Sequence, residues 1–317
     1  MNFVAPLSLS ASRIRELLSY PRAVEVLGDG ALADGAGTIV TPPRTVSHMS
    51  EQWSVLLMPA ASPSYWGAKI ISVSPDNPRR GRPRVEGTYV LFDGDTHQVL
   101  CLLDGAALTE IRTAAVSALA VTRLLGPDTD GVRLAVFGTG KQAVSHIEAL
   151  GSVVDLASVH VWGSSPQSAA RFADSYDLGI EVGVGTPEHL RAADLIACCT
   201  TSRRPLFPAS LLDAQCVVAV GSHDAEAQEL SGEAVGRCGT IVVEDKGVAL
   251  REAGDIVQAV RGGHIDEDRL CDLASLVGGK VTVDRTAPRL FKSVGVGWQD
   301  LVLASAIYES ARQAESP

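Results

Sequence analysis

A glycine-rich turn in the middle of the chain, LAVFGTGKQA at residues 134–143, has the composition of a phosphate-binding loop. A nucleoside triphosphate loop requires GxxxxGK followed by Ser or Thr, because that hydroxyl reaches the magnesium ion. In this sequence Ala135 occupies the place of the first glycine, and Gln142 follows the lysine. The triphosphate interpretation therefore fails at two positions.

The same turn fits a dinucleotide-binding motif, which consists of a strand, the pattern GxGxxG or GxGxxA, and a helix. RLAVF supplies the strand and AVSHIEAL the helix, with Gly138, Gly140 and Ala143 at the three motif positions. Gly138 would permit the tight turn, Gly140 would let a pyrophosphate approach the backbone, and Ala143 would let the helix pack on the strand. This turn predicts a nicotinamide dinucleotide.

The end of the second strand bears on which dinucleotide is bound. An NAD site usually places Asp or Glu there to hold the ribose hydroxyls. VHVWGSSPQ offers Gly163, Ser164 and Ser165 instead. Without a carboxylate to repel a 2′-phosphate, two hydroxyls and backbone amides could accept it, although the loop contains no arginine. The sequence therefore favours NADP(H) over NAD(H).

The elements around this turn alternate between short apolar strands and helices. The strands are predicted in RLAVFG, SVHVWG, IEVGV, LIACCTT, CVVAVGS and TIVVED, and helices in KQAVSHIEALGSV, PQSAARFADSYD and TPEHLRAAD. Such alternation is typical of a parallel sheet with crossover helices. The last stretch, RLFKSVGVGWQDLVLASAIYESARQ, is predicted to end in a helix, with no further strand obvious after it.

The first third of the chain has a different pattern. A helical start, SASRIRELLSYPRAVEVLGDGAL, precedes strand-like runs separated by turn residues, WSVLLMPA, GAKIISVSP, EGTYVLFD and HQVLCLLDG, which predict a mostly antiparallel sheet. The run DGAALTEIRTAAVSALAVTRLLG then predicts a helix that bridges into the second domain. We expect the C-terminal helix to return to the first domain. The predicted fold class is α/β, a Rossmann dinucleotide-binding domain at 116–292 plus a discontinuous α+β domain at 1–115 and 293–317 for substrate binding and dimerisation.

Composition excludes several classes of protein. A length of 317 residues suggests two domains, and 46% apolar with 20% charged residues is typical of a protein with a large core. A net charge of −10 argues against a nucleic-acid binder, and neither a membrane span nor a secretory signal is predicted. The basic run NPRRGRPR at 77–84 is interpreted as a solvated turn between strands. The six cysteines form no CxxC pair, which favours free thiols in the cytoplasm, and no metal-like spacing is found.

Several stretches together resemble the ornithine cyclodeaminase/mu-crystallin family of nicotinamide-dependent enzymes. They run from about Arg44 to Ala306 in the family's order: GAKIISVSPDNPRRGRPRVEGTYVLFD, LLDGAALTEIRTAAVSALA, LAVFGTGKQA, CTTSRRPLF and FKSVGVGWQDL. The resemblance implies a homodimer and hydride exchange at a carbon that carries both nitrogen and a carboxylate. Members include cyclodeaminases, alanine and arginine dehydrogenases, ketimine reductases and siderophore-precursor synthases.

The resemblance assigns the substrate-binding residues. Arg44, in PPRTV, and Arg112, in EIRTAA, look like the family's two carboxylate-binding arginines, since a guanidinium pairs bidentately with a carboxylate. Lys69, in GAKIISV, matches the active-site lysine. Between apolar residues of a strand, and near two guanidinium groups, its pKa should fall, so that it could act as a proton donor near neutral pH.

The resemblance also shows one departure, in VVAVGSHDAEAQEL. Cyclodeaminases and several amino-acid dehydrogenases carry an Asp two residues after the glycine that ends this strand, where it engages the substrate amine. Counting from Gly221, that position holds His223, followed by Asp224. Imidazole cannot duplicate the attraction of a carboxylate for an ammonium group, so imine reduction is favoured over ornithine cyclodeamination. His223 could donate a proton or only line the pocket, and Asp224 could also turn inward.

Further residues are expected at the cofactor. Thr113 should reach the phosphates or the nicotinamide from the bridging helix. The others, in addition to the glycine turn and the two serines above, are expected by resemblance or by their place at the carboxyl edge of the sheet: Thr139, Gln142, Thr200, Thr201, Ser202, Val220, Ser293 and Gly295.

The sequence thus predicts a dimeric reductase of small, cyclic ketimines such as pyrroline-2-carboxylate or piperideine-2-carboxylate. An amino-acid dehydrogenase or an ornithine cyclodeaminase is the alternative among enzymes. A mu-crystallin-like binding protein without activity is a second alternative, and the presence of Lys69 and both arginines argues against it.

Overall fold

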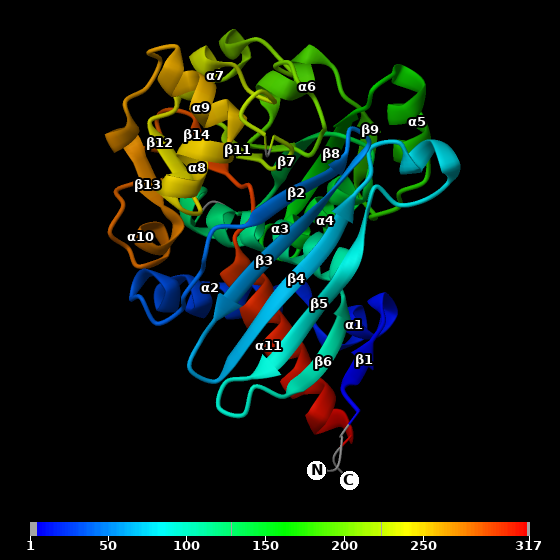
Figure 1. Cartoon of the computed structure of the whole chain (residues 1–317). Helices are drawn as coiled ribbons and strands as arrows, with labels where there is room; N and C mark the ends of the chain where they lie inside the picture. The colour runs from blue at the N-terminus through cyan, green and yellow to red at the C-terminus, as the bar shows by residue number, and fades with distance from the viewer. Residues whose placement is uncertain (1–4, 128, 223, 316–317) are drawn as a thin grey trace. The chain divides into compact units, whose positions relative to one another are not determined.

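The computed structural model describes residues 5–127, 129–222 and 224–315, and the chain divides into two compact units (Figure 1). Unit 1 comprises Met1–Arg112 and Gly295–Pro317, and unit 2 comprises Thr113–Val294. From the sequence, the domain that corresponds to unit 2 was predicted to span residues 116–292. The functions assigned to the two domains stay predictions.

Unit 1 contains a six-stranded sheet in the order β1-β6-β5-β4-β3-β2. The strands are β1 (Leu7–Leu9), β2 (Thr45–Ser50), β3 (Trp53–Ala61), β4 (Tyr65–Val73), β5 (Val85–Asp93) and β6 (Val99–Asp104). All neighbours are antiparallel except β1 and β6, which confirms the predicted sheet. The sequence missed β1, which has three residues, and β2, whose side chains are all exposed and so show no alternation of burial.

One face of this sheet is covered by the C-terminal helix α11 (Gly297–Glu315), which contacts β3, β4 and β5 (Figure 1). Helices α1 (Ala11–Leu17) and α2 (Tyr20–Gly35) complete the unit, and each begins at a serine N-cap, Ser10 or Ser19, whose side chain accepts a backbone amide. Side chains alternate between the two faces, so Leu56 and Ile71 are buried whereas Leu57 and Ile70 are exposed.

The basic run at 77–84 forms the connection between β4 and β5. It contains the short 3-10 helix η1 (Asn77–Arg80), and Gly81 follows it at φ +67°. Arg79, Arg80 and Arg82 are exposed, which confirms the interpretation as a solvated turn.

Unit 2 contains an eight-stranded sheet in the order β13-β12-β14-β11-β10-β7-β8-β9, and every neighbouring pair is parallel. This confirms the predicted α/β class. The strands are β7 (Val132–Phe137), β8 (Leu156–Trp162), β9 (Glu181–Val184), β10 (Leu195–Cys198), β11 (Cys216–Ala219), β12 (Thr240–Val243), β13 (Leu270–Asp272) and β14 (Arg289–Lys292). Central strands such as β10 and β11 are buried at every position, as expected for a parallel sheet covered on both faces.

Helices separate these strands. They are the bridging helix α3 (Gly105–Leu124), α4 (Lys141–Gly151), α5 (Pro166–Asp174), α6 (Pro187–Ala192), α7 (Gly232–Arg237), α8 (Lys246–Glu252), α9 (Gly254–Arg261) and α10 (Leu273–Val277). A cluster of buried side chains joins one face of the sheet to α6, α7, α8 and α9. None of the helices in the described residues is long and apolar enough to cross a membrane. All six cysteines are free thiols.

Strand β14 of this sheet was not predicted from the sequence. RLFK forms β14, which pairs with both β11 and β12 inside the sheet. The strand has only four residues, and charged Arg289 and Lys292 stand at its two ends, so its sequence lacks the apolar run of a buried strand. Lys292 is nevertheless fully buried, because its ammonium group lies 3.1 Å from a carboxylate oxygen of Asp255.

Candidate active site

Lys69 lies on the covered face of the unit 1 sheet. It is in β4, opposite Met58 of β3 and Tyr89 of β5, and its side chain is 0% exposed. Its Nζ donates to Asp300 Oδ1 at 3.0 Å and lies 2.8 Å from Oδ2. Asp300 is in the first turn of α11 and is also 0% exposed, so the two charges form a fully buried ion pair.

Burial lowers the pKa of Lys69 to about 8. The carboxylate of Asp300 acts in the opposite direction, and the guanidinium groups of Arg112 and Arg44 lower the pKa further. The expected decrease is thereby confirmed, with desolvation as its main cause. A lysine with this pKa can both hold and release a proton close to neutral pH.

The two predicted arginines lie with this pair in unit 1. Arg112 is 6% exposed, its Nε is 3.8 Å from Asp300 Oδ1, and Nη1 donates to Gln299 Oε1 at 3.5 Å. Arg44 Nη2 donates to the carbonyl of Gly295 at 3.0 Å. Gly295 has φ +80°, and a Cβ there would lie 2.4 Å from Arg112 Nη1, so only glycine fits beside that guanidinium. Unit 1 therefore brings the three predicted cations together.

Asp300 was missed by the sequence analysis. It lies in the run GWQDL, where an acidic residue in the first turn of a helix has an ordinary explanation in the helix dipole. The signal that could have identified it is its position among apolar residues of a buried helix, since a buried carboxylate requires a cation.

Tyr89 is a second buried polar residue beside Lys69. Its side chain is 0% exposed, and its hydroxyl has no hydrogen-bond partner among the residues that the structure describes. Burial, and then the charge of Asp300, raise the pKa of Tyr89 well above its usual value. The phenol therefore stays neutral and retains a proton to donate.

The glycine turn in unit 2 has the geometry of a dinucleotide site. Gly138 has φ +123°, and a Cβ there would meet the carbonyl of Cys199 at 2.7 Å, so the fold itself requires glycine. Gly140 is the N-cap of α4 at φ −97°, and a Cβ there would meet nothing within 4 Å. Packing within the described chain thus gives no reason for glycine at 140, whereas a phosphate approaching the helix N-terminus does.

Other predicted cofactor residues lie in or next to this turn in the sequence, and Thr113 lies in α3. Ala143 is 0% exposed, in the first turn of α4. Thr139 is half-buried, and Gln142 has a buried Oε1 without a hydrogen-bond partner in the described part of the chain. Thr113 is 7% exposed, in α3. A glycine that leaves space and an unpartnered amide oxygen both fit a bound dinucleotide.

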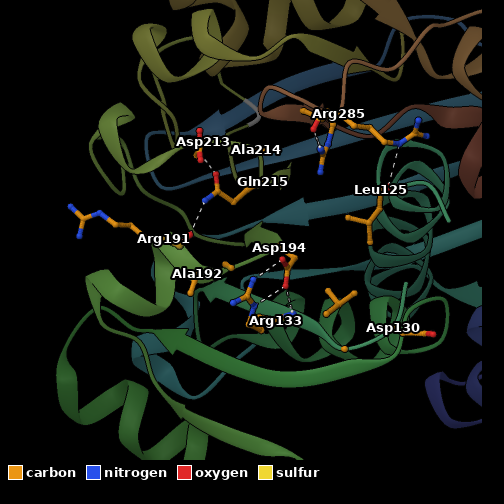
Figure 2. A pocket seen from close by; sticks show the side chains of 14 residues that line it. Leu125, Asp130, Arg133, Arg191, Ala192, Asp194, Asp213, Ala214, Gln215 and Arg285 are labelled. Carbon is orange, nitrogen blue, oxygen red and sulfur yellow. Dashed lines mark hydrogen bonds and ion pairs between the residues drawn. The ribbon is translucent and has the colours of Figure 1, made fainter. Parts of the chain in front are cut away.

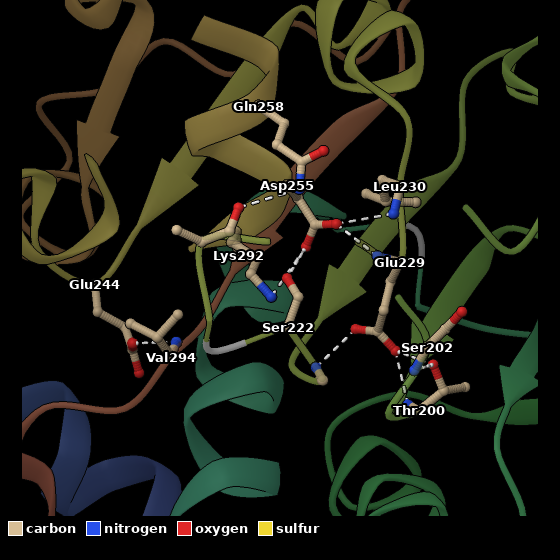
Figure 3. Close-up of polar contacts among 12 residues, drawn as sticks. Thr200, Ser202, Ser222, Glu229, Leu230, Glu244, Asp255, Gln258, Lys292 and Val294 are labelled. Carbon is tan, nitrogen blue, oxygen red and sulfur yellow. Dashed lines mark hydrogen bonds and ion pairs between the residues drawn. The ribbon is translucent and has the colours of Figure 1, made fainter. Parts of the chain in front are cut away.

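The carboxyl edge of the unit 2 sheet is held by the buried carboxylate of Glu229 (Figure 3). Glu229 Oε1 accepts the Thr200 amide at 2.7 Å and hydroxyl at 2.9 Å, and Oε2 accepts the Gly221 amide at 2.6 Å. Burial raises the pKa of Glu229, and Lys292 opposes this increase. One side chain thus fixes the loops after β10 and β11.

Most predicted residues at this edge have partners within unit 2. Ser202 Oγ donates to the Arg204 carbonyl at 2.6 Å, whereas Thr201 is exposed. The Val220 amide donates to the Cys198 carbonyl at 3.0 Å. The remaining one, Ser293, donates from Oγ to Glu244 Oε1 at 2.8 Å.

A second buried carboxylate, Asp255, supports the same loops and was not predicted (Figure 3). Its Oδ1 accepts the backbone amides of Glu229 and Leu230 at 2.7 and 2.9 Å, and its Oδ2 accepts the Ser222 hydroxyl at 2.5 Å. With Lys292 it forms a buried ion pair at the carboxyl edge of the sheet.

The serines after β8 lie at the start of α5. Ser165 is the N-cap, and its Oγ accepts the Ser168 amide at 3.1 Å. Ser164 is exposed. Capping occupies one acceptor position of Ser165 and the amides of Ser165 and Ser168, while the hydroxyl proton of Ser165 can still be donated.

The structure describes Asp224 but not His223 in the segment that departs from the cyclodeaminase pattern. His223 lies outside the described residues. Asp224 Oδ2 accepts from Arg203 Nη1 at 2.9 Å, and its side chain is 47% exposed. The Asp224 carboxylate is therefore ion-paired on the surface of unit 2.

Comparison with known proteins places these features in context. The model of the ornithine cyclodeaminase/mu-crystallin family matches residues 7–315. The chain is 35% identical over 307 residues, 95% of each chain, to a Delta(1)-pyrroline-2-carboxylate/Delta(1)-piperideine-2-carboxylate reductase of Azospirillum brasilense. It is similar to the Thermococcus litoralis Delta(1)-pyrroline-2-carboxylate reductase solved with NADH and L-proline, with a TM-score of 0.90, 28% identity, and coverage of 97% of this chain and 98% of that one.

An archaeal alanine dehydrogenase dimer solved with NAD has the same TM-score of 0.90 at 26% identity, covering 98% of this chain and 97% of the other. These matches cover nearly the whole chain and include both units. The predicted resemblance is confirmed, and the chain belongs to the ornithine cyclodeaminase/mu-crystallin family.

Proposed function

We propose that this protein reduces the C=N bond of small cyclic imino acids, with a nicotinamide dinucleotide as hydride donor. The observation that carries this proposal is the buried Lys69, with a pKa of about 8, held in one unit with Arg44 and Arg112. Relatives named as pyrroline-2-carboxylate reductases support the reaction, and the dinucleotide turn of unit 2 supports the cofactor.

In the proposed reaction, the substrate carboxylate pairs with the guanidinium groups of Arg44 and Arg112, which fixes the adjacent C=N carbon. The bound nicotinamide supplies hydride to that carbon. Lys69 donates a proton to the substrate nitrogen, so that the imine becomes a secondary amine. Asp300 keeps the ammonium form of Lys69 accessible at neutral pH, because its charge raises the pKa of Lys69 against the effect of burial.

Two enzyme classes are distinguished by their products. The proposed reductase consumes NAD(P)H with pyrroline-2-carboxylate or piperideine-2-carboxylate, whereas a cyclodeaminase releases ammonia from ornithine without net change of the cofactor. An amino-acid dehydrogenase would consume NAD(P)H only with a keto acid and ammonia. A panel of these substrates, followed at 340 nm and by ammonia release, tests the proposal. Ammonia release from ornithine as the main activity would overturn it.

We propose NADP(H) as the preferred cofactor, since the exposed Ser164 and the N-cap Ser165 provide hydroxyl donors and no carboxylate. Ser164→Asp should reverse the preference, because a carboxylate repels the 2′-phosphate and accepts the ribose hydroxyls of NADH. We expect the ratio of kcat/KM for NADPH to that for NADH to fall by about tenfold or more, the equivalent of ~1.4 kcal/mol. Gln167→Asp is the control, because it places the same charge at an exposed position in the first turn of α5. An unchanged ratio in Ser164→Asp would contradict the assignment.

The rate of imine reduction should fall as the pH rises through about 8, because Lys69 then loses the proton that it donates. Asp300→Asn removes the charge that raises the pKa of Lys69, so this decrease should move to lower pH by about one unit or more. The pH profile of kcat/KM for both proteins measures the shift, and the titration of the imine itself cancels in the comparison. A decrease at the same or higher pH in Asp300→Asn would exclude Lys69 as the titrating acid.

We also propose a cytoplasmic homodimer. The exposed face of the unit 1 sheet carries apolar side chains on neighbouring strands, with Leu57 of β3 opposite Ile70 of β4. Exposed apolar patches of this kind favour association, and an archaeal relative is described as a dimer. The free cysteines fit a reducing compartment. A monomeric mass in sedimentation equilibrium would contradict the dimer.

A further inference from the structure

A cavity of about 500 Å³ lies in unit 2, away from the residues assigned to the cofactor (Figure 2). Arg133 near the start of β7, Gln215 just before β11 and Arg289 at the start of β14 line it. Because all strands of this sheet are parallel, these positions share the amino edge. The glycine turn and Thr200 lie at the carboxyl edge, roughly 13 Å along a four-residue strand.

Arg133 contributes little net charge to this cavity. Its Nε and Nη2 donate to the two carboxylate oxygens of Asp194, each at 2.9 Å, and its backbone amide donates to the same group at 3.0 Å (Figure 2). This bidentate pair is neutral as a whole and forms part of the wall.

Arg289 has no such compensation. It is 5% exposed, its Nη1 donates to the Arg285 carbonyl at 3.1 Å, and its Nε has no hydrogen-bond partner among the described residues. No described carboxylate forms an ion pair with it. Asp284 Oδ1 accepts the amide and hydroxyl of Thr286 at 2.9 and 2.6 Å. These hydrogen bonds are the main reason that the pKa of Asp284 is lowered, and the charge of Arg289 contributes less. A buried guanidinium without an anion is costly unless a ligand supplies one.

A second cation, Arg285, is held in place beside it. Its Nε donates to the Leu125 carbonyl at 3.3 Å (Figure 2), and its Nη2 donates to the Arg123 carbonyl at 3.2 Å, at the C-terminal end of α3. These contacts use Nε and Nη2 of the Arg285 guanidinium and fix its orientation. A side chain that is already held in one orientation loses little conformational entropy when it binds a ligand.

The charges of the lining residues indicate what could bind. Arg191 is exposed and its side chain points away from the other lining residues (Figure 2), so with the Arg133–Asp194 pair set aside, Arg285 and Arg289 are the cations that a ligand could meet. Asp130 and Asp213 also line the cavity, and their negative charges disfavour a polyanion, so a small anion fits best. The volume is within the range of small-molecule sites.

We propose that this cavity binds a small oxyanion, a carboxylate or a phosphate, through Arg289 and Arg285. The guanidinium group matches the geometry of both anions. The proposal concerns binding alone and does not depend on the reaction proposed for the protein.

The test uses the protein saturated with NADPH, so that the dinucleotide site is filled, and adds inorganic phosphate or malonate in separate titrations. We expect the melting temperature to rise with at least one anion. Arg289→Met should weaken this anion by about tenfold or more. The same variant should melt at a higher temperature than the unmodified protein when no anion is present, because it removes an uncompensated charge. Arg285→Gln should weaken the anion in the same direction and serves if Arg289→Met does not fold.

Arg261→Gln is the matched control, because it removes a positive charge from unit 2 at an exposed ion pair with Glu226. It should keep the full response to the anion. A response to phosphate alone assigns the site to phosphate, and a response to malonate alone assigns it to carboxylate. The proposal is overturned if neither anion has an effect, if Arg261→Gln loses as much affinity as Arg289→Met, or if Arg44→Gln abolishes a response that Arg289→Met retains.

Discussion

Lys69→Met is expected to lower kcat/KM for imino acid reduction by roughly 10²–10⁴-fold, the usual contribution of a general acid. Methionine keeps the length of the side chain but can neither donate a proton nor hydrogen-bond the substrate. The affinity for NADPH should stay unchanged, because the dinucleotide turn belongs to unit 2 and Lys69 to unit 1. Steady-state kinetics and a fluorescence titration of NADPH measure the two effects.

A loss of folding must be separated from this loss of chemistry. Lys69→Met removes the near partner of the buried Asp300 and leaves it only Arg112, whose Nε is 3.8 Å away, so the free energy of unfolding should fall by up to about 3–5 kcal/mol. The double variant Lys69→Met/Asp300→Asn removes both charges and should recover most of that stability without recovering turnover. Recovery of turnover in the double variant would contradict the assignment of Lys69 as proton donor.

Unit 2 offers a matched control, since Lys292 and Asp255 form another ion pair in which both side chains are 0% exposed. Lys292→Met/Asp255→Asn removes the same charges, and Asn keeps an oxygen that can accept the amides now held by Asp255. We expect a change in KM for the cofactor and a much smaller loss of kcat. Equal loss of kcat in both double variants would indicate that buried pairs matter here only for folding.

The features that could be predicted from the sequence are those encoded over short stretches. A strand, a glycine turn and a helix lie within residues 133–150, and each step follows from local backbone requirements, so the dinucleotide turn was visible. The antiparallel strands β3 to β6 were predicted for the same reason, because turn residues separate apolar runs. The fold class and the family were therefore accessible before any coordinates.

The partners of buried charges could not be predicted, because they depend on contacts between residues far apart in sequence. Lys69 hydrogen-bonds Asp300, which is 231 positions away in the sequence, and Glu229 hydrogen-bonds Thr200, which is 29 positions away. No local pattern encodes such pairs. The strand β14 was missed for a related reason, since the charge of Lys292 is compatible with a buried strand only when Asp255 of another element neutralises it.

The two glycines of the dinucleotide turn should respond differently to the same substitution. Gly138→Ala places a Cβ 2.7 Å from the Cys199 carbonyl at φ +123°, so it should destabilise the fold by at least about 1–3 kcal/mol and lower the melting temperature by several degrees. Gly140→Ala has an ordinary φ of −97° and open space around the new Cβ, so its melting temperature should hardly change.

Gly140→Ala should instead act on the cofactor. If a pyrophosphate approaches the backbone at 140, a methyl group there displaces it and weakens hydrogen bonds from the start of α4, which are worth about 1.5–3 kcal/mol each when the acceptor is charged. The Kd for NADPH should then rise by about tenfold or more. Thermal melts without cofactor and titrations with NADPH, made on both variants, separate the two effects. Unchanged affinity in Gly140→Ala would mean that the glycine at 140 serves no bound dinucleotide, because the structure gives it no other reason to be there.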